Sequence, residues 1–176
     1  MAGHNKWSKI KHKKAASDAE KSKIFGKLAR LITIESKKAN GDTNSPGLRA
    51  VIEKAKASNM PKDNIERAVK KGVSADAASL EEVVYEVYGP GGSAVIISGL
   101  TDNKNRTAAE VKHLLSKNNL SLAEPGSALW AFKKEGGEYI PTSELPISDE
   151  DGEKLSKLME DLEELEDTQE IYTNAS

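Results

Sequence analysis

The sequence contains no cysteine, and aromatic residues make up only 5% of its 176 positions. The absence of cysteine excludes a disulfide framework, a thiolate metal site and a cysteine nucleophile. No apolar run approaches the roughly 18–20 residues of a membrane-spanning helix. The N-terminus also lacks the apolar stretch of a secretory signal. We therefore expect a cytoplasmic chain with an aliphatic core and no membrane association.

Residues suited to catalysis or metal binding are scarce as well. The chain has three histidines, and His4 and His12 are eight positions apart with no third ligand nearby. No set of nucleophile, base and orienting group stands out. The late carboxylates follow the pattern of a solvated helix surface. The sequence therefore predicts a non-enzyme without a cofactor or a bound metal.

Charge is unevenly distributed along the chain, although the formal net charge is only -2. Residues 1–72 carry 18 of the 26 Lys and Arg but 7 of the 28 Asp and Glu, which gives them a net charge of +11. The remaining residues carry -13. A basic half of this kind attracts polyanions such as nucleic acids. The alternative is that the two halves neutralise each other or are simply solvated.

Helical periodicity and helix-end signals predict a three-helix basic domain over residues 1–76. Ser17 and Glu20 form a capping-box pattern before the first helix, and Pro46 suits the first turn of the second. Met60 and Pro61 interrupt the pattern, and a third helix ends at Gly72. Apolar residues recur at helical spacing in all three segments.

The second half, residues 77–176, changes to a strand-type pattern. Strands are predicted over 83–88, 94–97, 128–132, around 139–140 and over 169–172. Helices are predicted after a capping box at Thr107 and after Ser148. From residue 94 onward the order is β-α-β-β-α-β, which is typical of a ferredoxin-like fold. The expected fold class is α+β, with the basic helices followed by a ferredoxin-like α/β sandwich that has one extra strand.

Cationic residues of the first half are the main candidates for contacts with phosphate. Lysine gains affinity for nucleic acid by releasing counterions. His12 is a further candidate beside the lysines, and Trp7 either stacks on a base or packs the N-terminal segment onto the helices. The predicted nucleic-acid-binding residues of this region are Lys6, Trp7, Lys9, Lys11, His12, Lys13, Lys14, Lys21, Lys23 and Arg30.

Three loops supply further candidates. Asn59, Met60 and Pro61 precede Lys62 at a predicted helix start, where an anion would be bound by free N–H groups, unless Asp63 or Asn64 only caps the helix. Tyr88, Gly89 and Pro90 begin a glycine-rich segment that favours a hairpin turn over a nucleotide cradle. Residues 101–107 lie between a strand and a helix and either hold a phosphate or form a solvated loop; their candidates are Asn103, Lys104, Asn105 and Arg106.

Four segments, in order, resemble the YebC family. They are Met-Ala-Gly-His-Asn-Lys-Trp-Ser-Lys-Ile-Lys-His-Lys-Lys-Ala-Ala at the N-terminus, Asn-Met-Pro-Lys-Asp-Asn-Ile-Glu-Arg-Ala-Val-Lys-Lys-Gly at 59–72, Tyr-Glu-Val-Tyr-Gly-Pro-Gly-Gly at 85–92, and residues 101–107. The end of the chain, 162–174, is similar too. Members of this family are typically longer and carry a third domain inserted in the second. Because residues 139–148 run directly to the last helix, this insert is expected to be missing near 140–148.

The resemblance implies a regulator of gene expression that binds nucleic acid. One implied function is support of translation through ribosomal RNA and the ribosome. The alternative is transcriptional control through double-stranded DNA. Lysine dominates, and no helix carries Arg, Asn and Gln in the manner of a recognition helix, so the sequence favours structured RNA. The protein is expected to be a monomer. A different class of function, a scaffold that binds a basic partner with the acidic half, stays open.

Overall fold

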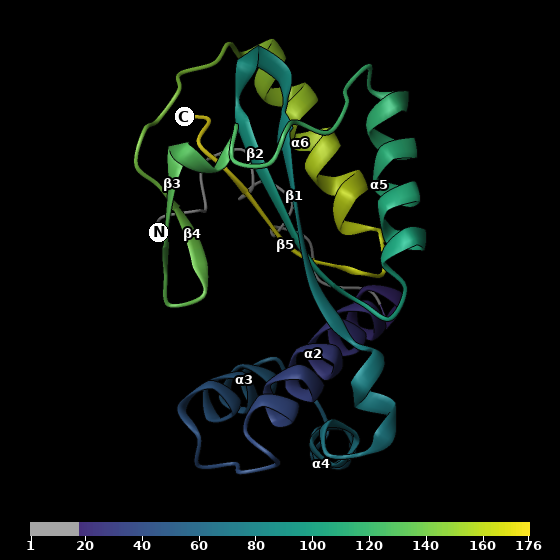
Figure 1. Ribbon diagram of the computed structural model, residues 1–176. Helices are drawn as coiled ribbons and strands as arrows, with labels where there is room; N and C mark the ends of the chain where they lie inside the picture. Colours follow the sequence, from purple (N-terminus) through teal and green to yellow (C-terminus); the bar gives the residue numbers. More distant parts are fainter. Residues whose placement is uncertain (1–17) are drawn as a thin grey trace. The chain divides into compact units, whose positions relative to one another are not determined.

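The computed structural model describes residues 18–176, apart from the side chains of Asp76 and Ala78 (Figure 1). The chain divides into two compact units. The helical unit holds the described residues up to Glu82 together with residues 100–103. The sheet unit holds residues 83–99 and 104–176. Within residues 18–176 there is no helix both long and apolar enough to cross a bilayer.

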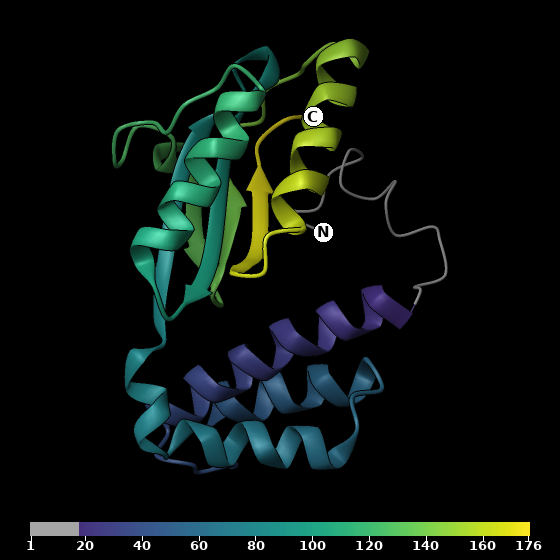
Figure 2. The same cartoon turned by 90° about the vertical axis from the view of Figure 1, so that its right-hand side faces the viewer.

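In the described residues, the helical unit consists of three α-helices and one short 3-10 helix. Figure 2 shows these helices packed side by side. Their bounds are α2 (Asp18–Lys38), α3 (Pro46–Ala57), α4 (Lys62–Gly72) and η2 (Ala75–Ser79). Leu28 and Ile32 of α2 pack with Leu48 of α3 and Ile65 of α4 in one core. The apolar spacing in the sequence therefore translates directly into the packed faces of the helices.

Close approach of α4 to α2 depends on a glycine. A Cβ at Gly72 would lie 2.6 Å from the carbonyl oxygen of Thr33, which is backbone and cannot give way. Two hydroxyl groups of α2 use this proximity, since Ser36 donates to the carbonyl of Val69 at 2.7 Å and Thr33 to that of Ala68 at 3.3 Å. These bonds fix the orientation of α4, and with it the direction of its charged side chains.

The sheet unit contains five strands, two α-helices and two short 3-10 helices. Their bounds are β1 (Glu81–Tyr88), η3 (Pro90–Gly92), β2 (Ala94–Thr101), α5 (Lys104–Lys117), η4 (Leu129–Ala131), β3 (Phe132–Glu135), β4 (Glu138–Pro141), α6 (Asp149–Glu163) and β5 (Thr168–Thr173). One sheet has the order β1-β2-β5, and β3 and β4 form a separate antiparallel pair. β2 and β5 pair antiparallel.

Both faces of the three-stranded sheet are covered, as the alternation along β2 requires. Val95 and Ile97 belong to the core with α5 and α6, whereas Ala94 and Ile96 belong to a second core with η4 and the β3–β4 pair. Figure 1 shows α5 and α6 on one side of the strands and β3 and β4 on the other. Every residue of β2 from Ala94 to Ile97 is therefore buried.

The predicted α+β class is confirmed, but the strand order differs from the ferredoxin-like expectation in one respect. β1 lies beside β2, at the position that a ferredoxin-like order gives to β4. A tight turn joins β1 directly to β2, with the Gly89 N–H donating to the Ser93 carbonyl at 2.7 Å. β1, which is close to β2 in the sequence, therefore occupies the edge of the sheet beside β2. The β3–β4 pair packs on the face of the sheet instead. There the rings of Tyr139 and Tyr172 meet edge to face.

Several predicted boundaries held and others were wrong. Ser45 precedes α3 with Pro46 in its first turn, and the Ser148 hydroxyl caps α6 by accepting from the Asp151 N–H. Residues 128–132 were predicted as a strand but contain η4 and only the first residue of β3. The helix expected to begin after Thr107 begins at Lys104. The Ser17 part of the first capping box lies outside the described residues.

Candidate functional site

Helix α4 carries the densest group of cations among the described residues. Arg67, Lys70 and Lys71 are exposed, and none of them forms an ion pair within residues 18–176. Arg67 and Lys71 are four positions apart and therefore neighbours on the helix surface. Ile65 and Ala68 are buried in the core below. The arrangement presents fixed positive charge to solvent.

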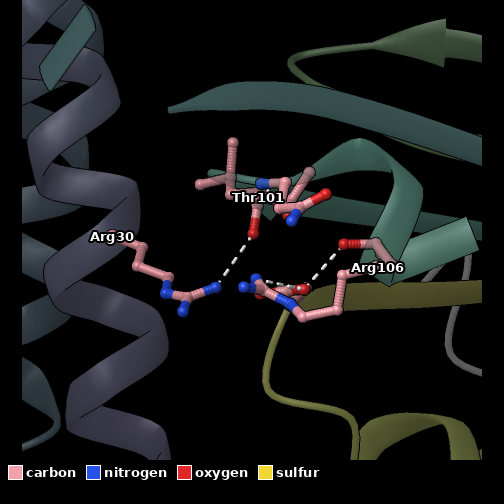
Figure 3. Close-up of polar contacts among 7 residues, drawn as sticks. Arg30, Thr101 and Arg106 are labelled. Atoms are coloured by element: carbon pink, nitrogen blue, oxygen red, sulfur yellow. Dashed lines mark hydrogen bonds and ion pairs between the residues drawn. The ribbon is translucent and has the colours of Figure 1, made fainter. Parts of the chain in front are cut away.

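Two more unpaired cations lie on the other helices of the same unit. Lys21 on α2 and Arg49 on α3 are exposed, and neither has an ion-pair partner among residues 18–176. Lys23 and Arg30, the other candidates on α2, do have partners in the fold. Arg30 donates from Nη1 to the carbonyl oxygen of Leu100 at 3.0 Å, as Figure 3 shows. Arg30 is thus tied to backbone of its own unit.

Other lysines of the helical unit are paired with carboxylates. Lys38 contacts Glu82 at 2.8 Å and Glu35 at 3.3 Å, and its hydrogen bond to Glu82 is the main cause that raises the pKa of the Lys38 ammonium. Lys56 pairs with Glu53 at 3.3 Å. These pairs are exposed, and exposed ion pairs contribute only about 0–1 kcal/mol. Internal neutralisation is therefore partial: it reaches some lysines and leaves Arg67, Lys70 and Lys71 of α4 without a carboxylate partner among the described residues.

The Asn59-Met60-Pro61 segment forms the turn between α3 and α4. Asn59 adopts a left-handed conformation with φ 62°, and Met60 donates its N–H to the Ala55 carbonyl at 3.0 Å. The Met60 side chain is buried in the core. Pro61 is the N-cap residue of α4, so the expectation that Asp63 or Asn64 caps this helix is wrong. All three motif residues have a defined part in the fold.

Lys62 occupies the first position of α4, as predicted. Its side chain is 88% exposed and lies 3.7 Å from the Glu66 carboxylate. A cation at the N-terminus of a helix opposes the helix dipole. Asp63 and Glu66 offset the charge of Lys62 only weakly, because these side chains are exposed to solvent. The charge is available to an anion that approaches the N–H groups of the first turn.

Residues 101–107 are held by an internal ion pair. Arg106 donates to both carboxylate oxygens of Asp167, at 3.1 and 2.9 Å, and the Thr107 hydroxyl donates to the same carboxylate at 2.6 Å (Figure 3). Asp167 is buried. Burial of the Tyr85 phenol raises its pKa, and the negative charge of Asp167 raises it further. Thr107 is the fourth residue of α5 and not its N-cap, and its hydroxyl bonds Asp167 from within the helix.

The exposed side chains of this loop remain candidates. Asn103 donates its N–H to the Thr101 hydroxyl at 2.9 Å, which turns the chain into α5. Lys104 and Asn105 follow on the exposed start of the helix. Lys104 is engaged within the fold. The structure thus gives Arg106 a structural partner and leaves a phosphate contact at this loop as a prediction.

An aromatic pair occurs where the sequence pointed only to Tyr88. The Tyr88 hydroxyl donates to the Ser127 carbonyl and accepts from the Trp130 indole at 3.3 Å. Trp130 is 63% exposed. Gly89 and Pro90 follow in the turn to β2, as expected. The indole lies beside Tyr88 because η4 replaces the predicted strand, which is why sequence reasoning missed it.

Arg49, Arg67, Lys70 and Lys71 were also missed as candidate contacts. The signal was present, since the last three lie within the quoted segment 59–72 at helical spacing. Candidates Lys6, Trp7, Lys9, Lys11, His12, Lys13 and Lys14 lie outside the described residues and stay predictions. Residues 18–176 contain no group of three side chains suited to a metal ion.

These features define an α+β protein with a compact helical unit that exposes unpaired cations. Family models match nearly the whole chain: the TACO1/YebC protein N-terminal domain matches residues 5–75, and the TACO1/YebC second and third domain matches residues 80–137 and 137–175. The chain belongs to the TACO1/YebC family, as the sequence motifs indicated.

Curated relatives are bacterial proteins named probable transcriptional regulatory proteins. One from Fervidobacterium nodosum is 54% identical over 85% of this chain and 60% of its own length. One from Kosmotoga olearia is 49% identical over 98% of this chain and 70% of its own length. The chain thus spans about 60–70% of the length of these relatives. A crystal structure of a conserved hypothetical protein from Aquifex aeolicus matches with a TM-score of 0.86 and 31% identity, over 98% of this chain and 97% of that one.

Proposed function

We propose that this chain is a non-enzymatic regulator of gene expression that binds nucleic acid with its helical unit. The observation that carries the proposal is the group of cations without carboxylate partners in the described part of this unit: Lys21, Arg49, Arg67, Lys70 and Lys71. Basic side chains that stay unpaired in the folded protein release counterions from phosphate when they bind. The names of the curated relatives support a regulatory role.

The cations of α4 are suited to hold a backbone and not to read bases. Arg67 and Lys71 form a short positive ridge on one face of the helix, and contacts of this kind position a nucleic acid without sequence information. Lysine predominates over Arg, Asn and Gln, the residues that reach base edges. We therefore propose structured RNA, in particular ribosomal RNA on the ribosome, as the target, with support of translation in the cytoplasm as the role.

Double-stranded DNA is the second candidate target. The observation in its favour is the name that the relatives carry, probable transcriptional regulatory protein. Sequence-specific control of transcription requires a preference for the operator of about 10³-fold or more over other DNA. Binding to DNA without such a preference would support the positioning role alone.

A double charge reversal on α4 tests the proposal. Arg67→Glu with Lys71→Glu is expected to raise the Kd for a structured RNA at least ~10-fold and to reduce the slope of log K against log salt by about two, one unit for each lost phosphate contact. Lys112→Glu with Lys117→Glu on α5 is the matched control, because both lysines are exposed, neither has an ion-pair partner among residues 18–176, and the change in charge is the same. Equal effects of the two pairs on affinity and slope would contradict a site on the helical unit.

A second measurement separates the two targets. The full chain is sedimented with ribosomes after DNase treatment, and its affinities for an RNA hairpin and a DNA duplex are compared at one salt concentration. Cosedimentation that is lost on the α4 reversal and retained with the α5 control supports the RNA target. Protection of particular promoter sequences, without ribosome association, supports the DNA target instead.

A further inference from the structure

The helical unit contains an apolar groove between α3 and α4 whose floor is separate from the proposed nucleic-acid contacts, although Lys62 and Lys70 at its edges are candidates for both. Its volume is about 510 Å³. Ile52 of α3, Met60 of the turn and Ile65 and Val69 of α4 contribute its apolar lining. Met60 and Ile65 are buried, and Ile52 and Val69 are half-buried. The groove therefore exposes aliphatic surface that the fold itself does not cover among the described residues.

Lysines stand at the edges of this groove. Lys56 lies on the α3 side, and Lys62 and Lys70 lie on the α4 side, two turns apart. Glu66 also lines the groove, so the charged side chains of the lining are three lysines and one carboxylate. Within the described residues, Lys56 and Lys62 form exposed pairs with neighbouring carboxylates, and Lys70 has no ion pair there. Exposed pairs of this kind exchange readily because water competes for both partners. An occupant with carboxylates beside apolar groups would complement both the floor and the edges.

The chemistry of the floor distinguishes a peptide from a nucleobase. A base inserted on the floor would bury polar edge atoms against Ile52, Met60, Ile65 and Val69, whose side chains offer no hydrogen bond. The polar lining residues Thr43 and Glu66 could meet only part of the base's edge. Burial of unsatisfied polar groups is costly. Aliphatic or aromatic side chains lose nothing by the same burial. The floor thus favours apolar side chains of a polypeptide over bases.

Segments of this chain fit the groove poorly. Residues 1–14 carry five lysines and no acidic residue, the same sign as the groove edges. The acidic helix α6 has suitable charge, but its apolar residues Leu155, Leu158 and Leu162 are buried in the core of the sheet unit. A second copy could not present that face without unfolding. The complementary occupant is therefore a segment of a different protein.

We propose that the groove between α3 and α4 binds an acidic peptide segment of a partner protein, whose aliphatic or aromatic side chains enter the groove while its carboxylates pair with Lys56, Lys62 and Lys70. The mode is that of a peptide in a helix-lined groove. This binding does not depend on the proposed contacts of Arg67 and Lys71 with nucleic acid.

Selection of random peptides displayed on phage tests the proposal with the full chain as bait. The expected winners combine apolar residues with Asp and Glu. A synthetic winner should bind at least ~10-fold more weakly to Lys56→Glu/Lys62→Glu/Lys70→Glu, because electrostatic complementarity is reversed. Arg49→Glu/Arg67→Glu/Lys71→Glu is the matched control with the same change in net charge, and its peptide affinity should change less than ~3-fold. The control variant should bind nucleic acid more weakly. Failure of the peptide proposal can therefore be distinguished from failure of the nucleic-acid proposal.

A neutral pair of changes tests the floor. Ile52→Gln with Val69→Gln alters half-buried positions, and circular dichroism and the melting temperature establish that the variant is folded. Peptide affinity should fall while salt-dependent RNA binding persists. Winners that lack acidic residues, or that bind this variant as well as the parent, overturn the proposal. Loss of single-stranded oligonucleotide binding in this variant, with peptide binding intact, assigns the groove to nucleic acid and overturns it too.

Discussion

Glu86 is a buried carboxylate whose partners are all backbone groups. It accepts from the N–H of Gly126 at 2.7 Å, of Ala128 at 3.0 Å and of Leu129 at 2.8 Å. Hydrogen bonds to a charged group contribute more than neutral ones. This one side chain of β1 therefore fixes the start of η4, and through η4 the position of Trp130.

Glu86→Ala is expected to lower the free energy of unfolding by about 3 kcal/mol, because it leaves three backbone donors without their acceptor. Urea unfolding followed by circular dichroism measures the change. Glu144→Ala, at an exposed position, should stay within about 0.5 kcal/mol of the parent. A Glu86→Ala variant as stable as this control would show that water replaces the carboxylate without cost.

Tyr172 is a buried phenol whose ionisation the fold opposes. Burial, and then the charge of Glu170, raises the pKa of Tyr172 well above its ordinary value. A group with a raised pKa in the folded state contributes stability that is present below the unfolded pKa of about 10 and is lost as the pH rises beyond it. Alkaline pH is therefore expected to destabilise the sheet unit.

The Tyr172→Phe variant should lose less stability than the parent between pH 8 and pH 11. At pH 11, one pH unit above the unfolded pKa of about 10, the two losses of stability should differ by about 1.4 kcal/mol. Urea unfolding at the two pH values gives both losses, so that any effect of the substitution itself at pH 8 cancels. Tyr85→Phe should act in the same direction, since burial and Asp167 raise the pKa of Tyr85. Equal losses in Tyr172→Phe and parent would contradict the raised pKa.

At the scale of the element, the α3–α4 turn rests on a residue other than glycine in a left-handed conformation. Asn59 tolerates φ 62° better than most residues do, yet less well than glycine. Asn59→Gly is expected to be neutral or to stabilise by up to about 0.5 kcal/mol, whereas Asn59→Ala should destabilise by about 1 kcal/mol. Thermal unfolding distinguishes them, with Asn44→Ala in the preceding loop as the control. Greater stability of the Ala variant would contradict a strained turn.

Elements that depend on local patterns were predictable from the sequence. The apolar stripes of α2, α3 and α4, the proline at the start of α3 and the serine cap of α6 are all short-range signals. The departures come from distant partners. Glu86 holds residues 126–129 across 40 or more positions, and Asp167 takes the Thr107 hydroxyl from about 60 positions away. No periodicity within a window can reveal such a partner.

The candidate site, like the fold, was predictable where it depends on local sequence and not where it depends on distant partners. Basic composition identified the helical unit, and the motif at 59–72 contained the unpaired Arg67, Lys70 and Lys71. Which cations are paired was not predictable, because Lys38 meets Glu82 and Arg106 meets Asp167 only in the folded chain. The exposed indole of Trp130 depends on η4 and was likewise hidden from sequence reasoning.

At the scale of the whole molecule, the chain spans only about 60–70% of the length of the curated relatives, and the boundary between two family matches falls at a defined point in the fold. The two matches to the family's second and third domain meet at Gly137. Gly136 and Gly137 form the exposed tip between β3 and β4, where an added Cβ would meet nothing within 4 Å. We propose that the family's third domain, which we expect this chain to lack, would join at this tip. Residues 140–148, the position expected from the sequence, include a segment that bonds to the C-terminus: Leu145 donates to the Asn174 carbonyl at 2.8 Å and accepts from the Ser176 N–H at 2.9 Å.

Insertion of a flexible Gly-Ser segment tests this assignment. Between Gly136 and Gly137 the insertion should change the free energy of unfolding by less than about 1 kcal/mol, because a lengthened surface loop costs little entropy. The same segment between Glu144 and Leu145 should destabilise by about 2 kcal/mol or more, since it separates Leu145 from Ser143, whose carbonyl accepts from Asn174 at 3.0 Å. Urea unfolding of both variants gives the comparison. If the hairpin insertion is the more damaging, the β3–β4 tip is no place where a domain is gained or lost, and the junction lies nearer the C-terminal strand.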